Sequence, residues 1–197
     1  MDLCDRLHLE RPVLQAGMGG GLATADLAAA VSRGGGLGTL GITSPRRLVA
    51  EVRRARHLAP KRPIAVNLLL PFTRSEHVEA CVAERVDAVV LFFGFHRGMV
   101  ARFRDAGIFV LHQVGTVDEV RRAVADGADA IVAQGREAGG HLMGTQNTLA
   151  FLPGALDAAA GRPVVAAGGL ADPGDVHAAL AAGASAVLCG TRFLLTT

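Results

Sequence analysis

A helix–turn–strand unit is repeated along this chain, and it limits the possible folds more than any other feature. Residues 120–133 (VRRAVADGADAIVA) align without gaps on residues 176–189 (VHAALAAGASAVLC), and residues 78–91 (VEACVAERVDAVVL) align more loosely. Each copy begins with apolar residues at helical spacing and ends in an apolar run. Gly127 and Gly183 stand where a helix commonly ends in a left-handed residue. An uninterrupted apolar strand indicates burial on both faces, as in a parallel sheet.

The same pattern along the whole chain predicts an α/β fold, a (βα)8 TIM barrel of eight parallel strands. The predicted strands are residues 13–16, 37–40, 64–69, 88–92, 108–112, 130–134, 164–167 and 186–190. The predicted helices are residues 24–33, 45–57, 75–84, 96–106, 117–126, 149–160 and 173–182. An open, doubly wound sheet has the same alternation and is the alternative, but the near-even spacing and the strand number favour closure. No helix is predicted after the last strand, so the barrel is expected to be truncated before its eighth helix.

In parallel barrels the active site is built on the loops that follow the carboxyl ends of the strands. Here these ends carry glycines and neutral hydrogen-bonding side chains, few carboxylates and no cluster of metal ligands. The residues concerned are Gln15, Gly17, Met18, Gly41, Thr43, Asn67, Phe93, Gly94, His112, Gln113, Gln134, Glu137, His141, Gly168, Gly169, Gly190 and Thr191. This set predicts a site for an organic cofactor and no metal site.

Glycines at two neighbouring strand ends predict a phosphate site. The pairs Gly168-Gly169 and Gly190-Thr191 follow the last two predicted strands, where many barrels bind phosphate through backbone N–H groups. Tight turns that require glycine are the alternative. Glycines 19–21 likewise indicate either a close approach to a planar ring or a flexible loop.

Histidine supplies the candidate proton carrier. His141 follows the pair Gly139-Gly140 in a loop over the predicted barrel mouth, and imidazole exchanges protons near neutral pH. His112 also lies at a strand end and is a second candidate base, unless it lines the barrel and bonds a backbone group. The remaining histidines are expected to face solvent: His8, His57, His77, His96 and His177.

Composition argues against several classes of function. The net charge is only +2, basic and acidic residues are interspersed, and aromatic residues are scarce, so no nucleic-acid partner is expected. Lys61 is the only lysine and precedes a predicted strand, which is the wrong end for the Schiff-base chemistry of an aldolase-type barrel. Cys4, Cys81 and Cys189 lack disulfide or zinc-site spacing and fit a reducing cytoplasm. Neither a signal peptide nor a membrane span is predicted.

A glycine motif in the first third of the chain matches the dinucleotide-binding fingerprint by chance. Gly36, Gly38 and Gly41 fit G-x-G-x-x-G, but they run into and through a predicted strand. The fingerprint needs its glycines after a strand, at the start of a helix, with an acidic residue about 20 positions further on. Lys61 occupies that position, so we do not interpret the motif as a nucleotide site.

Four segments together resemble the nitronate monooxygenase (2-nitropropane dioxygenase) family and its relative, the flavin-dependent enoyl-acyl-carrier-protein reductase II. They are residues 12–20 (PVLQAGMGG) with 27–38 (LAAAVSRGGGLG), 66–68 (VNL), 129–141 (DAIVAQGREAGGH), and 163–169 (PVVAAGG) with 190–193 (GTRF). The likeness runs from about residue 11 to residue 197. One departure is Gly17, which stands where the family usually has proline between alanine and methionine.

The resemblance implies one FMN-binding barrel domain over residues 1–197, from which the C-terminal part of the family's chain is absent. His141 matches the active-site histidine of the family. Gln15, Gly17 and Met18 are implied near the isoalloxazine, and Asn67 and Gln134 as its hydrogen-bond partners. The complete set of implied FMN contacts is Gln15, Gly17, Met18, Asn67, Gln134, Gly139, Gly140, Gly168, Gly169, Gly190 and Thr191.

The activity that the resemblance implies is oxidation of alkyl nitronates with O2 to a carbonyl compound and nitrite. An NAD(P)H-dependent reductase of enoyl thioesters and a truncated FMN-binding domain without catalysis are the alternatives. A phosphate-binding aldolase or isomerase barrel is a further alternative on fold alone. The expected partners are a small-molecule nitronate or enoyl thioester and O2, for a cytoplasmic protein with no membrane or nucleic-acid partner. The sequence leaves open whether the protein forms a homo-oligomer.

Overall fold

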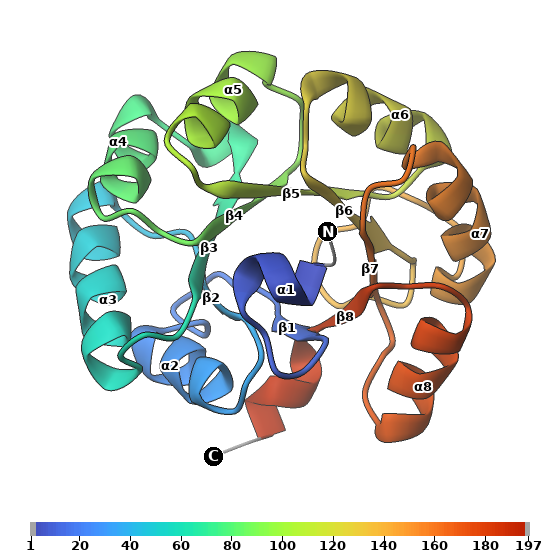
Figure 1. The fold of residues 1–197 in the computed structure, drawn as a ribbon, viewed down its shortest axis with the longest axis horizontal. Helices are drawn as coiled ribbons and strands as arrows, with labels where there is room; N and C mark the ends of the chain where they lie inside the picture. Colours follow the sequence, from blue (N-terminus) through green and yellow to red (C-terminus); the bar gives the residue numbers. More distant parts are fainter. Residues whose placement is uncertain (1–2, 196–197) are drawn as a thin grey trace.

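In the computed structural model, which describes residues 3–195, eight parallel strands form a barrel surrounded by helices (Figure 1). Apolar runs without polar interruption form these strands because both of their faces are covered. The strands are β1 (Val13–Gln15), β2 (Gly38–Leu40), β3 (Ile64–Leu69), β4 (Ala88–Phe92), β5 (Phe109–Val114), β6 (Ala130–Gln134), β7 (Val164–Ala167) and β8 (Ala186–Cys189). All the predicted strands are confirmed, although β5 continues beyond its predicted end at residue 112.

Helices alternate with the strands, and the predicted helices are confirmed. They are α2 (Ala25–Arg33), α3 (Pro45–Leu58), α4 (Ser75–Ala83), α5 (Arg97–Asp105), α6 (Val117–Asp126), α7 (Thr148–Ala158) and α8 (Pro173–Ala181). Thr116 and Glu119 form a capping box at the start of α6, and Gly127 ends that helix with a φ of 95°. The repeated sequence unit therefore corresponds to a repeated structural unit.

Three short elements were not predicted: α1 (Leu3–Leu7) and the 3-10 helices η1 (Leu70–Phe72) and η2 (Thr191–Leu195). Elements this short give no usable hydrophobic periodicity. In Figure 1, α1 lies across the centre of the barrel, and its Leu3 and Leu7 belong to the interior cluster. Within the described residues only η2 follows β8, and it lies between α8 and α2 (Figure 1).

The barrel is nearly closed, which excludes the open sheet. Every neighbouring pair from β2 through β8 and on to β1 is joined in parallel register. Between β1 and β2 there is a single bridge, Leu14 to Leu37. Two backbone hydrogen bonds cross this seam, from Leu37 N to Val13 O (3.0 Å) and from Gln15 N to Leu37 O (2.9 Å).

Side chains pack in two layers, one inside the barrel and one between the strands and the helices. Leu14, Leu111 and Val132 lie in the interior cluster. Outside the strands, Gly38 lets α2 approach β2, because a Cβ there would lie 1.9 Å from the Ala28 carbonyl oxygen. This close contact explains the central glycine of the G-x-G-x-x-G match. Among residues 3–195, no helix combines the length and the apolar sequence needed to cross a membrane.

Candidate functional site

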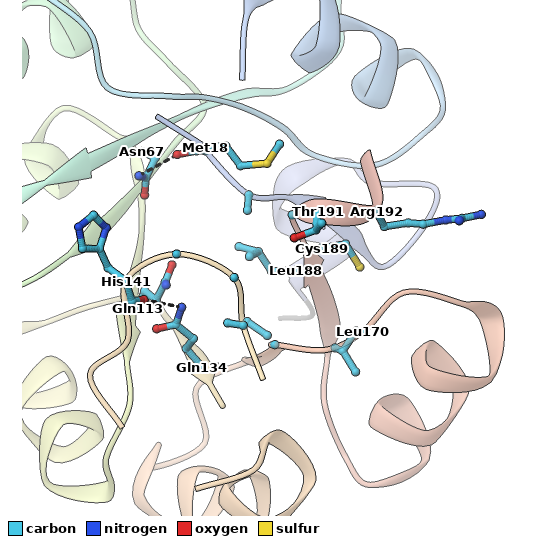
Figure 2. Close-up of a pocket in the computed structure, with 18 of the residues that line it drawn as sticks. Met18, Asn67, Gln113, Gln134, His141, Leu170, Leu188, Cys189, Thr191 and Arg192 are labelled. Carbon is cyan, nitrogen blue, oxygen red and sulfur yellow. Dashed lines mark hydrogen bonds between the residues drawn. The ribbon is translucent and has the colours of Figure 1, made fainter. Parts of the chain in front are cut away.

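A cavity of about 530 Å³ lies at the carboxyl ends of the strands (Figure 2). This volume is typical of a site for a cofactor or a drug-sized ligand. The loops after β1, β6, β7 and β8 form most of its wall. The predicted site residues that line it are Gly17, Met18, Asn67, Gln134, Gly139, Gly140, His141, Gly168, Gly169, Gly190 and Thr191. Gln113 and Glu137, also predicted at strand ends, line it as well. The predicted strand-end residues that do not line it are Gln15, Gly41, Thr43, Phe93, Gly94 and His112.

Three amide side chains from the strands line this cavity: Asn67 on β3, Gln113 on β5 and Gln134 on β6. Asn67 Nδ2 donates to the Gly17 carbonyl at 3.2 Å, and Gln134 Nε2 donates to the His141 carbonyl at 3.1 Å. Gln134 Oε1 is buried and has no donor among the described residues. Since an unsatisfied buried acceptor costs about 1–3 kcal/mol, this atom indicates a ligand that brings its own N–H or O–H.

Glycines in the wall are required partly by the protein's own packing. Gly17 passes directly over Asn67, because a Cβ on Gly17 would lie 2.2 Å from Asn67 Cβ. Gly168 has a φ of 110°, and its Cβ would lie 2.8 Å from Thr148 Oγ1. Turn geometry and close packing therefore account for Gly168 without any ligand. By contrast, a Cβ on Gly190 would make only ordinary contacts, the nearest at 3.5 Å, so its backbone is open to a bound group.

The loop after β6 is tied to the loop after β7 by two residues. Glu137 Oε2 accepts from the backbone N–H of Thr148 at 2.9 Å, which satisfies a free donor at the start of α7. The Thr148 hydroxyl, 2.8 Å from the Gly168 carbonyl oxygen, donates to the β7 loop. Although Glu137 lines the cavity, its carboxylate is occupied in capping the start of α7 and is not free to act as an acid or a base. Sequence reasoning did not single out Thr148, because its function depends on a contact across the barrel rim.

His141 stands on the outer part of the β6 loop, exposed to solvent. Its ring packs edge-to-face against Phe93, with the centroids 5.2 Å apart and an interplanar angle of 83°. Phe93 has a φ of 64°, which is unusual for a bulky residue and is common near functional sites. Figure 2 shows the imidazole on the side of the cavity where Asn67 lies. His141 is therefore placed to bind an anion or to move a proton at the cavity mouth.

His112 is a structural histidine, so the hypothesis of a second base is wrong. Leu111 faces the barrel interior, and strand alternation points His112 outward, where it stacks on Phe95 with centroids 4.8 Å apart. Its Nε2 lies 2.9 Å from the Gly94 carbonyl oxygen, and because a carbonyl only accepts, Nε2 carries the proton. Desolvation lowers the pKa of His112, against smaller opposing effects from Gly94, Asp126 and Glu119.

The lowered pKa of His112 predicts acid sensitivity of the fold. Below the unfolded-state pKa of about 6.5, the unfolded chain binds a proton that the folded chain does not. The contribution of neutral His112 to the unfolding free energy is therefore complete above that pH. It is lost as the pH falls toward the lowered pKa of the folded state. His112→Gln keeps a donor near Gly94 but cannot titrate, so we expect the unfolding free energy to depend less steeply on pH as the pH falls below about 6.5. Urea titrations of both proteins test this, and equal slopes would contradict it.

A second histidine is also more buried than expected. His77 is only 4% exposed, although it was predicted to face solvent. Its Nδ1 accepts from the Arg74 backbone N–H at 3.0 Å, and its Nε2 lies 2.8 Å from the Thr43 carbonyl oxygen. It thus joins the loop before α4 to the loop after β2. The prediction is confirmed for the other four, which are exposed: His8, His57, His96 and His177.

Other lining residues escaped sequence analysis because apolar strand residues carry no distinguishing signal. Phe92 and Leu188 project inward from β4 and β8. Arg192 lies at the rim and follows the Gly190-Thr191 pair, and in Figure 2 its side chain extends away from the cavity centre. Cys189 also lines the cavity, and burial raises the pKa of its thiol, which disfavours it as a nucleophile. Among residues 3–195, no three His, Cys, Asp or Glu side chains are grouped as a metal site.

The structure is thus a parallel (βα)8-type barrel with a cavity at the carboxyl ends of its strands, and amide side chains line the floor of that cavity. The family model "Nitronate monooxygenase" matches residues 2–77 and 72–197. The chain belongs to the nitronate monooxygenase family of oxidoreductases, whose members typically bind FMN.

Curated relatives carry two different names. The chain is 37% identical over 200 residues to a Mycobacterium tuberculosis protein named (3aS,4S,5R,7aS)-5-hydroxy-7a-methyl-1-oxo-octahydro-1H-indene-4-carboxyl-CoA dehydrogenase, covering 99% of this chain and 56% of that protein. It is 30% identical to a probable nitronate monooxygenase of Staphylococcus aureus, covering 98% of this chain and 67% of that protein. The chain thus spans little more than half the length of the first of these relatives.

Solved structures agree with this assignment. FabK from Thermotoga maritima superimposes with a TM-score of 0.91 at 34% identity, covering 98% of this chain and 61% of that one. Nitroalkane oxidase from Streptomyces ansochromogenes superimposes with a TM-score of 0.90 at 32% identity, covering 98% of this chain and 67% of that one.

Proposed function

We propose that this chain binds FMN in the cavity and forms the flavin-binding part of an oxidoreductase. The observation that carries the proposal is the floor of three amides in which Gln134 Oε1 is buried without a donor. The edge of a flavin ring presents both N–H and carbonyl groups, so it can donate to Gln134 and accept from the amides of Asn67 or Gln113. Family membership supports the same cofactor.

The remaining wall also fits this cofactor. Gly17 and Met18 offer backbone and a flexible thioether beside a planar ring. Gly190 and Thr191 offer an unobstructed backbone, and Thr191 adds a hydroxyl, for a terminal phosphate. Gly139 and Gly140 complete the FMN contacts that we propose on the β6 loop.

FMN, when bound, supplies one- or two-electron redox chemistry beside the substrate. The residues of this chain bind and orient the reactants. His141, exposed at the mouth, can hold an anionic nitro group through its ring N–H or accept a carbon-bound proton at a free ring nitrogen. Phe93 restricts the imidazole to one side of the cavity. Apolar side chains such as Leu69 and Phe92 exclude water from the floor.

The first substrate class that we propose is alkyl nitronates, oxidised with O2 to a carbonyl compound and nitrite. The test is to purify the protein in its full natural chain, record a flavin spectrum, and follow O2 uptake and nitrite with propionate 3-nitronate. We expect a yellow protein with nitronate-dependent O2 uptake. A yellow protein without such uptake would refute this substrate class and leave FMN binding intact, whereas a colourless protein that binds no added FMN would refute both.

Acyl thioesters are the second substrate class, favoured by the 37% identity to a protein whose name describes a dehydrogenase of an indene-carboxyl-CoA thioester. Anaerobic bleaching of the flavin by NADH or NADPH, followed by reoxidation with an enoyl thioester, would support this alternative. A flavin that is reduced rapidly by a nitronate and only slowly by either nicotinamide would argue against it.

A further inference from the structure

We propose that Gln15 is a positioning residue that completes the β1–β2 seam of the barrel and thereby fixes the first wall of the cavity. Its side chain is 0% exposed. Gln15 Oε1 accepts from the Thr39 backbone N–H at 3.0 Å, and Gln15 Nε2 donates to the Thr39 carbonyl at 3.0 Å. Nε2 also donates to the Ala16 carbonyl. One amide thus satisfies both backbone groups of a residue on the next strand.

The seam is where such a contact is needed. In the regular parallel pattern, after the bond from Gln15 N to Leu37 O, Thr39 N–H would donate to the Gln15 carbonyl. The Thr39 carbonyl would then accept from Gly17 N–H. The side-chain amide of Gln15 takes the place of both missing backbone groups. On the other side of β1 the Ala16 N–H donates to the Cys189 carbonyl at 2.8 Å, which continues the regular ladder between β1 and β8.

Strand alternation keeps Gln15 away from the ligand. Leu14 and Ala16 both pack with the interior cluster, so the side chain between them leaves the strand on the opposite side. The cavity wall begins only at Ala16. Gln15 therefore acts on the site through the backbone that follows it and not by contact.

The segment after Gln15 is held from two directions. On the seam side it is fixed by the Gln15 amide. On the interior side the Gly17 carbonyl accepts from Asn67 Nδ2 at 3.2 Å. The segment of Ala16, Gly17 and Met18, which all line the cavity, is thus bonded at its start to β2 and at Gly17 to β3. Loss of the seam contact should loosen this wall before it affects the distant strands.

The test compares Gln15→Leu, which removes the side-chain hydrogen bonds to Thr39 and Ala16, with Gln113→Leu, which removes an amide that lines the cavity. In the protein without ligand, we expect Gln15→Leu to speed hydrogen exchange in peptides covering residues 14–18 and 37–41, and Gln113→Leu to leave both unchanged. The Kd for FMN should rise about tenfold or more in Gln15→Leu. The spectrum of the bound flavin should stay unshifted, because no contact to the ring is lost. Gln113→Leu should weaken FMN binding and shift the spectrum.

Unchanged exchange at residues 37–41 in Gln15→Leu would overturn the proposal, and so would a shifted spectrum with normal exchange. Should Gln15→Leu fail to fold, Gln15→Met replaces it. Methionine has about the length of glutamine but no amide to pair with the two backbone groups of Thr39, so exchange at residues 37–41 should again rise. The affinity measurement rests on the proposed FMN site. The exchange measurement does not, so a protein that binds no FMN still tests the seam.

Discussion

Replacing His141 with alanine is expected to lower kcat for nitronate oxidation about 10²- to 10⁴-fold, the usual contribution of a positioned acid or base. The imidazole is exposed at the cavity mouth and contacts Phe93. It is thus available to the substrate and is not part of the packed core. The bond from Gln134 to the loop uses the His141 carbonyl, which alanine retains. The affinity for FMN should therefore change little, whereas kcat should fall by the factor given above.

Steady-state O2 uptake and FMN titration measure the two effects separately. His57→Ala is the matched control, because His57 is another exposed histidine, on α3 and outside the cavity wall. Added imidazole should restore part of the activity of His141→Ala. The control His57→Ala should be fully active without added imidazole. A His141→Ala protein with normal kcat across the pH range would remove His141 from the chemistry and leave the cofactor site standing.

Replacing Gly168 with alanine should destabilise the protein by about 2–5 kcal/mol, the sum of two separate costs. A left-handed φ of 110° costs an L-residue about 1–2 kcal/mol. Crowding adds about 1–3 kcal/mol, because the new Cβ would lie 2.8 Å from Thr148 Oγ1 and 2.9 Å from the Gly135 carbonyl oxygen. FMN binding should weaken too, because a shift of Gly168 moves the β7 loop that lines the cavity.

Gly161→Ala separates these two costs. Gly161 has a φ of 78°, lies outside the cavity wall, and has no atom within 4 Å of an added Cβ. It should lose only the conformational part, about 1–2 kcal/mol, with FMN affinity unchanged. Urea denaturation and FMN titration of both variants give the comparison. If both variants lose equal stability, the packing of Gly168 against Thr148 is not a real constraint.

The order of helices and strands could be predicted because its signals are local. An apolar run between two amphipathic helices fits a parallel strand covered on both faces, and the units around residues 130 and 186 show it directly. The strand-end rule then located the cavity, since Gln134 ends β6, Gly190 follows β8, and both reach it.

Side-chain direction at those strand ends could not be predicted. β5 reads Phe-Val-Leu-His-Gln-Val, and a strand with both faces buried has no polar alternation to show which residues point inward. Gln113 faces the cavity and His112 faces the helices, a choice made by the register of β5 in the barrel. Similarly, Gln15 gives no sign in the sequence that its amide bonds Thr39, a residue 24 positions away.

The sequence by itself determined the repeating helix and strand units, the glycine-rich strand ends and the loop that carries His141, because each depends on residues near one another in the chain. Tertiary structure alone decided that Gln15 closes the seam, that His112 and His77 are buried, and that Thr148 joins two loops. The physical reason is the same in each case. A buried polar group must find a partner, and closure of the barrel decides which backbone groups come within its reach.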